Sequence, residues 1–162
     1  MNAFTVIIRP VRLKDAQQVR DNCFSANTFE QVKKGIRHSQ YAAAKGKEIQ
    51  LVAEVEGTVV GIVSLVRKMH PLNNHRAEVG GLVVEPNYQG RGIARRLVSA
   101  CQEKAQQMGI SILEISCRAG EPAEQIYPRL GFIEYGRLPC GIVEPWGEYK
   151  KYDQIYFYKP ID

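Results

Sequence analysis

The segment 82–94 constrains the fold more than any other part of this 162-residue chain. Its apolar run stops at Pro86, a polar turn follows, and Gly90 and Gly92 lead into an amphipathic segment. This order predicts a strand, a glycine-rich turn and a helix. The first amides of such a helix have no partner within it and lie at the positive end of its dipole. Because glycine lets a ligand approach the backbone closely, the turn predicts a site for an anion, most naturally a phosphate.

Two common phosphate-binding motifs do not match this turn. A Walker A loop requires Gly-Lys-Ser/Thr, whereas Gly92 is followed by Ile93 and Ala94. A dinucleotide fingerprint requires a third Gly or Ala at the position that Arg95 occupies. The sequence therefore argues against nucleoside triphosphate hydrolysis and against dinucleotide binding here.

The composition, 44% hydrophobic and 24% charged, predicts one soluble domain over residues 1–162 with a continuous core. No apolar run in the sequence approaches the ~20 residues that span a bilayer, so we expect no membrane partner. The N-terminal apolar stretch is too short for a signal peptide, and the four cysteines show no Cys-x-x-Cys spacing. We therefore expect reduced thiols and a cytoplasmic protein.

The net charge of +5 suits an anionic small ligand and is also compatible with nucleic acid. The sequence has no Lys/Arg block and no basic helix with interleaved aromatic residues, so we expect no nucleic-acid partner. His70 and His75 share a polar loop without a nearby cysteine, which argues against a metal site.

Apolar spacing and turn residues predict alternating strands and helices. Helices are expected over 13–23, over 28–45 with Thr28 as the N-cap, between Gly90 and Gly109, and over 122–130. Strands are expected over residues 4–9, 49–55, 58–67, 76–85, 110–117, 132–138 and 152–158, with a loop over 139–151. The strand, helix and strand across residues 76–117 imply one parallel pair.

Paired glycines, Gly80 and Gly81, interrupt the strand that precedes the turn. Such a pair commonly marks a bulge or a close backbone approach. Here it would part the strand from its neighbour beside the anion turn. The sequence leaves open whether this opening serves a ligand or only local packing.

Two motifs resemble the GNAT superfamily of acyl-CoA-dependent N-acyltransferases. Gln89, Gly92 and Ala94 form Gln-x-x-Gly-x-Ala, which is similar to the pyrophosphate-binding motif of that superfamily. Residues 123–132 form Ala-x-x-x-Tyr-x-Arg-Leu-Gly-Phe, a second family pattern. The order of elements also matches, so the resemblance covers nearly the whole chain. It implies an α/β (mixed α+β) fold: a mixed, mostly antiparallel sheet of about seven strands, splayed in the middle and flanked by about four helices.

Three further segments, 75–79, 123–124 and 157–159, resemble the small-molecule acetyltransferases of the tabtoxin-resistance type. The resemblance implies direct transfer of acetyl from acetyl-CoA to a primary amine of a small molecule. A protein N-terminus or lysine is an alternative acceptor. A non-catalytic acyl-CoA-binding regulatory module is an alternative of another class, and the oligomeric state, a homodimer included, stays open.

The resemblance also implies how acetyl-CoA binds. Its pantetheine would run along the splayed strand, and its pyrophosphate would lie on the amides of residues 90–94. A backbone N–H near Val83 or Val84 would polarise the thioester oxygen. The expected acetyl-CoA-binding residues are Leu82, Val83, Val84, Gln89, Gly90, Arg91, Gly92, Ile93, Ala94 and Tyr127.

Amine attack on a thioester requires a neutral nitrogen and a stabilised leaving thiolate. Glu78 is the candidate base, acting through a water. Strand alternation places it on the face of Gly80 and Leu82 unless the bulge resets the register. The structural alternative is an ion pair with a neighbour such as Arg76.

Tyr127 is the second candidate catalytic residue. An ordinary tyrosine has a pKa of about 10 and stays protonated at neutral pH, so it can donate a proton to the thiolate or a hydrogen bond to its sulfur. The structural alternative is a buried ring that covers the sheet. Pro128, which follows, is expected to kink or loosen the helix end.

Overall fold

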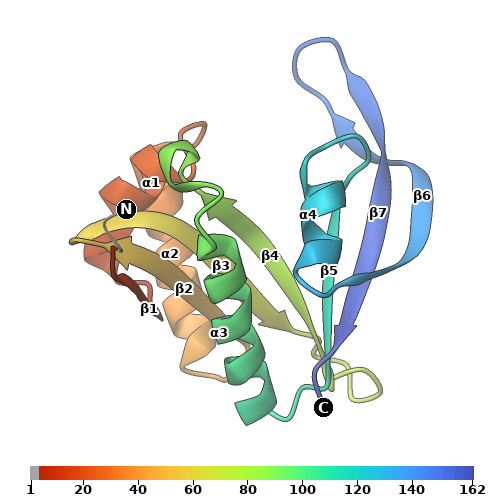
Figure 1. Cartoon of the computed structure of the whole chain (residues 1–162), viewed down its shortest axis with the longest axis horizontal. Coiled ribbons are helices and arrows are strands. Elements are labelled where there is room, and N and C mark those ends of the chain that lie inside the picture. The colour runs from red at the N-terminus through yellow and green to blue at the C-terminus, as the bar shows by residue number, and fades with distance from the viewer. Residues whose placement is uncertain (1–3) are drawn as a thin grey trace.

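A computed structural model describes residues 4–162, and one seven-stranded sheet runs through them (Figure 1). The strand order is β1-β2-β3-β4-β5-β7-β6, and neighbours are antiparallel except for β4 and β5. The predicted mixed, mostly antiparallel sheet with its one parallel pair is confirmed. The elements are β1 (Val6–Pro10), η1 (Leu13–Asp15), α1 (Ala16–Asn22), α2 (Phe29–Ala43), β2 (Glu48–Val55), β3 (Thr58–Arg67), β4 (Arg76–Val84), η2 (Pro86–Tyr88), α3 (Ile93–Gln107), β5 (Ile112–Arg118), α4 (Ala123–Arg129), β6 (Ile133–Glu144) and β7 (Lys150–Pro160).

Each face of the sheet carries its own hydrophobic core. Leu97 and Cys101 of α3 are fully buried in the larger core, where α3 packs against β2, β3 and β4. Val19 of α1 and Ile36 of α2 are buried in the smaller core on the opposite face, against β2 and β3. Tyr127 of α4 packs against the larger core, so α4 and α3 lie on the same face. Removing each large aliphatic side chain from water stabilises the fold by about 1.5–3 kcal/mol.

Local hydrogen bonds determine where the first helices begin. Thr28 and Gln31 form a reciprocal capping box at the start of α2, which confirms the predicted N-cap. The helix predicted over 13–23 begins as the 3₁₀ turn η1 before α1. This turn forms because the Asp15 carboxylate accepts the amide of Arg12 at 2.7 Å and so holds the chain in a tighter turn.

A bulge in β4 opens the sheet. Ser64 of β3 lies opposite Gly80 and Ile62 lies opposite Val83, so two residues of β4 face a single residue of β3. Gly81 takes a φ of +56°, which only glycine adopts without strain. Parallel pairing with β5 is confined to the stretch from Arg76 to Glu78. Beyond it the two halves of the sheet diverge, and the predicted bulge and splayed sheet are confirmed (Figure 1).

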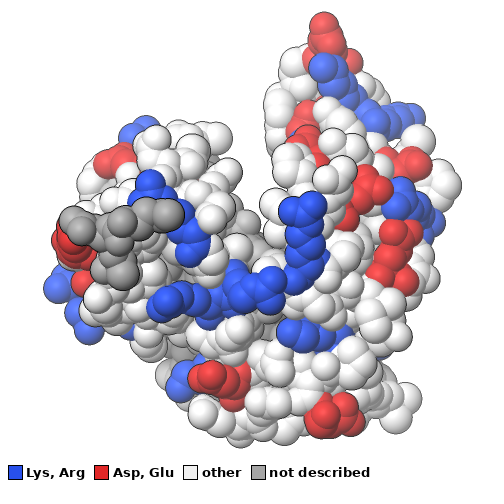
Figure 2. Space-filling model, viewed as in Figure 1, with Lys and Arg blue, Asp and Glu red and all other residues white. Residues whose placement is uncertain are grey.

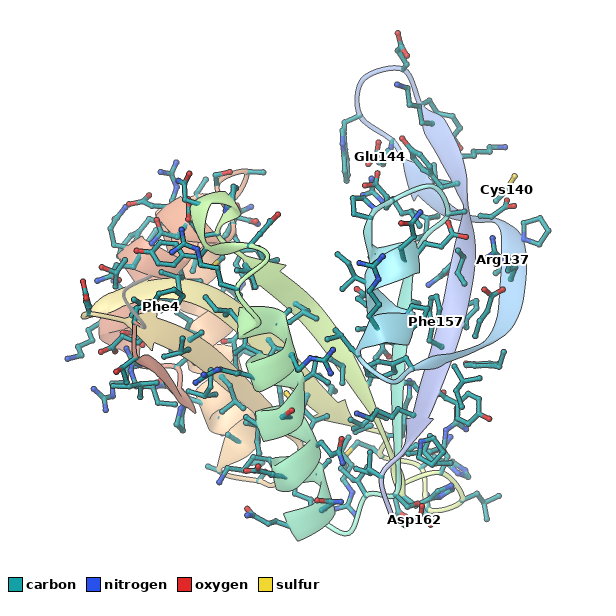
Figure 3. All side chains as sticks on the ribbon, viewed as in Figure 1. Phe4, Arg137, Cys140, Glu144, Phe157 and Asp162 are labelled. Carbon is teal, nitrogen blue, oxygen red and sulfur yellow. The ribbon has the colours of Figure 1, made fainter. Side chains whose placement is uncertain are left out.

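Strands β6 and β7 extend well into the predicted loop 139–151, so that prediction is wrong. Residues 139–141 form a bulge opposite Asp153, whose carboxylate accepts the amide of Cys140 at 3.0 Å (Figure 3). Pro139 has no N–H and fits a bulge without losing a ladder hydrogen bond. Proline and glycine therefore interrupt the pairing here without ending the strand.

Asp15 joins the first strand to the first helix. It is buried, and its carboxylate accepts two hydrogen bonds from the Arg9 guanidinium, at 2.7 and 2.9 Å. Burial raises the pKa of Asp15, but the bonds from Arg9 and from the Arg12 amide outweigh it, so the pKa lies below its usual value. A carboxylate with a lowered pKa stabilises the fold above its unfolded pKa, and this contribution disappears as the pH falls through the folded pKa.

We expect Asp15→Asn to lower the free energy of unfolding at pH 7 by about 2 kcal/mol, because it leaves Arg9 with only one carboxylate partner. The deficit should shrink below about pH 4, where the wild-type carboxylate becomes protonated as well. Urea unfolding at pH 7 and pH 3 measures both effects. Glu148→Gln, at a side chain 83% exposed, is the control and should change neither value. Equal losses in the two variants would contradict this account.

Candidate active site

The turn before α3 presents a row of free amides. Gly90 and Gly92 take φ values of +72° and +78°, and Gly92 is the N-cap of α3. Within residues 4–162, no backbone or side-chain acceptor pairs with the amides of residues 90–94. The Gln89 side chain donates to the carbonyl of Val84 at 3.0 Å and so fastens the turn to the end of β4. Free amides at the start of a 15-residue helix can bind a phosphate.

Arginines surround this turn. Figure 2 shows Lys and Arg side chains crossing the floor of the notch between the two halves of the sheet. The Arg91 guanidinium lies 5.3 Å from the ring centre of Phe4 and 5.4 Å from that of Tyr88. Arg95 donates to the carbonyl of Arg129 at 2.9 Å and links α3 to α4. These fixed positive charges attract an anionic ligand to the turn.

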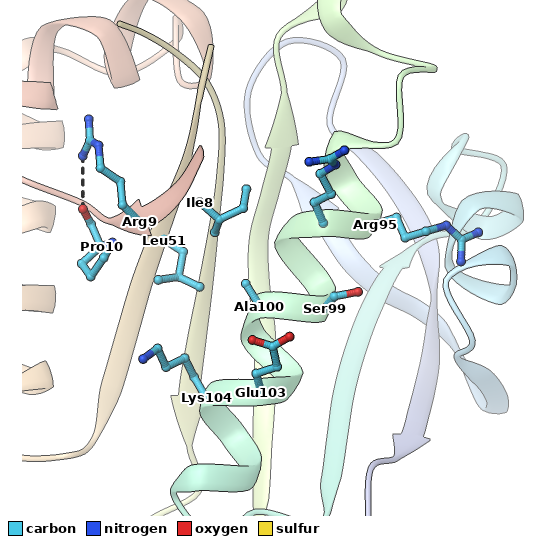
Figure 4. A pocket seen from close by; sticks show the side chains of 10 residues that line it. Ile8, Arg9, Pro10, Leu51, Arg95, Ser99, Ala100, Glu103 and Lys104 are labelled. Carbon is cyan, nitrogen blue, oxygen red and sulfur yellow. Dashed lines mark hydrogen bonds between the residues drawn. The ribbon is translucent and has the colours of Figure 1, made fainter. Parts of the chain in front are cut away.

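The groove of about 550 Å³ between β1 and α3 contains none of the predicted site residues (Figure 4). Arg95 reaches from α3 toward α4, away from the strands on the other side of the groove. The groove therefore lies beside the candidate site. Its lining includes Ile8, Leu51, Arg96, Ser99, Glu103 and Lys104.

The bulge resets the strand alternation around Glu78. In the parallel ladder, Glu78 lies opposite Glu114 of β5, and the Glu78 side chain lines a cavity of about 380 Å³. Leu82, in contrast, packs against the core beneath α3. Glu78 and Leu82 therefore lie on opposite faces, as expected if the bulge resets the register, because the extra residue at Gly81 reverses the direction of the side chains that follow.

A charge network holds the walls of this cavity. Glu78 pairs with Lys68 at 3.0 Å, so the partner is not Arg76, the neighbour named from the sequence. Arg76 instead donates to the buried carboxylate of Glu114 at 3.1 Å. Sequence reasoning missed Glu114, although an acidic residue within the apolar run of β5 is a signal that could have found it. Tyr135 and Tyr156 line the same cavity.

Tyr127 projects from α4 onto the face of the sheet opposite the one that carries Glu78. Its ring centre lies 5.6 Å from that of Phe157 on β7 and 6.2 Å from that of Phe132. Burial raises the pKa of Tyr127 to about 12, with a smaller contribution from Cys117. No residue from 4 to 162 forms a hydrogen bond with its hydroxyl. Helix α4 ends at Arg129, directly after Pro128.

The structure thus places the two candidate catalytic residues on opposite faces, on the two sides of the gap between β4 and β5. Glu78 belongs to the strand on one side of the gap, and Tyr127 lies over the strands on the other. The free amides at the start of α3 follow directly from the end of β4. This geometry allows a reaction in which two molecules meet within the gap from opposite faces.

Two further properties concern metals and membranes. In the part of the chain that the structure describes, no three His, Cys, Asp or Glu side chains gather closely enough to hold a metal ion. None of the helices described is both long and apolar enough to span a bilayer.

Comparison with known proteins identifies the class. Residues 15–132 match the model of the Acetyltransferase (GNAT) family. The chain belongs to this family, as the two sequence motifs predict.

The chain is also similar to particular members. It is 40% identical over 76 residues to an acetyltransferase from Yersinia pestis (strain Pestoides F), a match over 47% of this chain and 50% of the relative. The chain thus spans about half the length of this curated relative. Among solved structures, yncA from Salmonella typhimurium with its cofactor acetyl-CoA has a TM-score of 0.81 at 20% identity, covering 97% of this chain and 94% of that one. An acetyl transferase from the same organism, which modifies the N-terminal serine of ribosomal protein L7/L12, has a TM-score of 0.82 at 17% identity, covering 99% and 97%.

We expect Tyr127→Phe to leave the free energy of unfolding within about 0.5 kcal/mol of wild type, because the hydroxyl has no protein partner to lose. Tyr127→Ala should lower it by about 3 kcal/mol, because the contacts with Phe132 and Phe157 disappear. Urea unfolding of both variants measures the difference. A large loss in Tyr127→Phe would show that the hydroxyl is structural.

Proposed function

We propose that this chain is an N-acetyltransferase that transfers acetyl from acetyl-CoA directly to the primary amine of a small molecule. The observation that carries the proposal is the gap between β4 and β5, which opens beside the free amides at the start of α3. The gap provides an unpaired strand edge, and the turn provides an anion site next to it. The similarity of fold to yncA, which was solved with acetyl-CoA, supports this assignment.

The residues at the gap fit the chemistry of acetyl-CoA. Its pyrophosphate would take the amides of residues 90–94, where two glycines with positive φ leave the backbone open. Its pantetheine amides would pair with the free edge of β4 near Leu82 and Val84. Gln89 and Arg91 would then shape the turn, because Gln89 is bonded to Val84 and Arg91 lies against two aromatic rings. Bound there, acetyl-CoA supplies an activated acyl group.

Glu78 would take up the proton that the amine loses. The acceptor nitrogen forms a bond to the thioester carbon, the carbon–sulfur bond breaks, and the nitrogen's proton passes through a water to the Glu78 carboxylate. Lys68, at 3.0 Å, holds this carboxylate in place on the acceptor's side of the sheet. A backbone N–H near Val83 or Val84 would stabilise the negative charge on the carbonyl oxygen.

Tyr127 would donate a hydrogen bond to the departing sulfur. Its pKa of about 12 keeps the phenol neutral across the working pH range. An ordinary thiol has a pKa of about 8.5, so complete transfer of the phenol proton to a thiolate is unfavourable. Of the two functions that the sequence allows, hydrogen bonding to the sulfur therefore fits the environment better.

Acetyl-CoA and CoA should each raise the melting temperature, by roughly 5–10 °C at hundredfold excess over Kd, because they bind only the folded protein. ATP and NADH should not raise it. Gly92→Val should abolish the shift, because valine strains a turn that requires a φ of +78°. A thermal-shift series measures all of these effects. A shift with ATP or NADH and none with CoA would overturn the assignment.

We expect Glu78→Gln to lower kcat by about a hundredfold and Tyr127→Phe by about tenfold, with little change in the acetyl-CoA-induced shift. Thiol release with an amine acceptor measures turnover, and Glu121→Gln, in an exposed turn, is the control. Full activity in both variants would show that the site is assigned wrongly. A regulatory module without catalysis would instead bind acetyl-CoA and turn over no amine or peptide.

A further inference from the structure

The cavity of about 380 Å³ beside Glu78 contains a primary amine of the protein itself. Among the described residues that line it, Lys68 alone carries one. Arg76, the other cation in the lining, cannot act as a nucleophile, because its guanidinium stays protonated. The amide of Lys68 donates to the carbonyl of Arg76 at 2.9 Å, which holds the start of the Lys68 side chain against β4. Lys68 is therefore a built-in part of the acceptor's side of the sheet.

Lys68 occupies the position at which an acceptor amine would meet the candidate base. Its Nζ donates to Oε2 of Glu78 at 3.0 Å and lies 4.0 Å from Oε2 of Glu114. Glu114 has a partner of its own, because Arg76 donates to it at 3.1 Å. Within residues 4–162, Lys68 is the one ion-pair partner of Glu78. The protein thus holds one of its own amines against the carboxylate that is proposed to deprotonate amines.

The Lys68 amine needs to move only a short distance to reach an acyl group in the gap. A single water that bridges Glu78 and an acceptor nitrogen separates the two by about 5–6 Å, the span of two hydrogen bonds. Because the Nζ of Lys68 lies 3.0 Å from the carboxylate, a movement of about 3 Å takes it to that position. The Lys68 side chain is 34% exposed, and its four-carbon stem is flexible enough for this movement. An amine attached this close to the acyl group reacts at a high effective concentration.

We propose that the protein acetylates its own Lys68 when acetyl-CoA is bound and no other amine occupies the cavity. This inference rests on the proposed acetyl transfer. Glu78 takes one proton from the Lys68 ammonium and releases it to water, and the neutral nitrogen forms a bond to the thioester carbon. The carbon–sulfur bond then breaks, and the second proton of the nitrogen passes to the departing thiolate. The products are an acetamide on Lys68, free CoA and one proton.

Acetylation changes the cavity in two ways. The amide carries no charge, so Glu78 loses the cation that faces it. The added acetyl group also takes up space, because it extends a side chain that lines the cavity. The modification therefore restricts the acceptor's side of the sheet after a single turnover.

The test incubates the full chain with acetyl-CoA that carries an isotope-labelled acetyl group, without any added amine. Peptide mass spectrometry follows the label at each lysine. We expect Lys68 to be acetylated at least about tenfold faster than Lys150. Lys150 is the matched control, because it lies 3.4 Å from the Glu148 carboxylate, is 58% exposed and does not line the cavity. Its rate measures the direct chemical acetylation of an exposed lysine beside a carboxylate.

Three variants separate the enzymatic reaction from chemical labelling. Glu78→Gln should lower the rate at Lys68 by about a hundredfold, because the base is lost. Gly92→Val should lower it as well, because this variant no longer binds acetyl-CoA, and neither variant should change the rate at Lys150. Lys68→Arg keeps a cation opposite Glu78 without a primary amine, and it should abolish the release of one CoA per chain. Tenfold dilution of the wild-type protein should leave the rate constant unchanged, because the reaction is intramolecular.

The outcomes distinguish this inference from the proposed function. If acetyl-CoA raises the melting temperature but Lys68 reacts no faster than Lys150, the inference is overturned and the proposed function stands. A rate at Lys68 that rises with protein concentration, or one that Glu78→Gln leaves unchanged, also overturns the inference alone. If acetyl-CoA neither raises the melting temperature nor labels Lys68, the proposed function fails, and the inference fails with it.

Discussion

One extra residue in β4 determines where this sheet opens. A continuous ladder would pair every backbone group of β4 and β5 and leave no room between them. The bulge at Gly81 twists the strand away after only a short parallel pairing, so that one edge of β4 lies free. An unpaired edge inside a folded domain must find other hydrogen-bond partners. The free edge is therefore both a cost to the fold and the feature that makes a binding site available.

The two faces of this opening differ in their electrostatics. On the face of α3, free amides and arginines that form no ion pair with a carboxylate within residues 4–162 create a positive field suited to an anion. On the other face, Lys68 and Arg76 are each paired with a glutamate, so the local charges nearly cancel. The modest net charge of the chain conceals this division, because a sum over all residues cannot show where the charge lies.

Local signals in the sequence were sufficient to predict the helices and the bulge. The spacing of apolar residues identified the helices, and Gly80 and Gly81 identified the bulge. The sequence could not show which way side chains point beyond the bulge, because one inserted residue reverses the alternation. Nor could it show that Glu114 pairs with Arg76, because this contact joins residues from different strands. Long-range pairing of this kind leaves only a weak local signal, an acidic residue in an apolar strand.

The placement of Glu78 and Tyr127 on opposite faces has a kinetic consequence. Under the proposed assignment, the acyl donor and the amine reach the gap through separate entrances, so neither molecule blocks the other's exit. An enzyme built in this way has no structural reason to impose an order of binding or release. It also leaves the thioester open to water from the acceptor side whenever the amine is absent. Under the proposed assignment, slow hydrolysis of bound acetyl-CoA is therefore an expected side reaction.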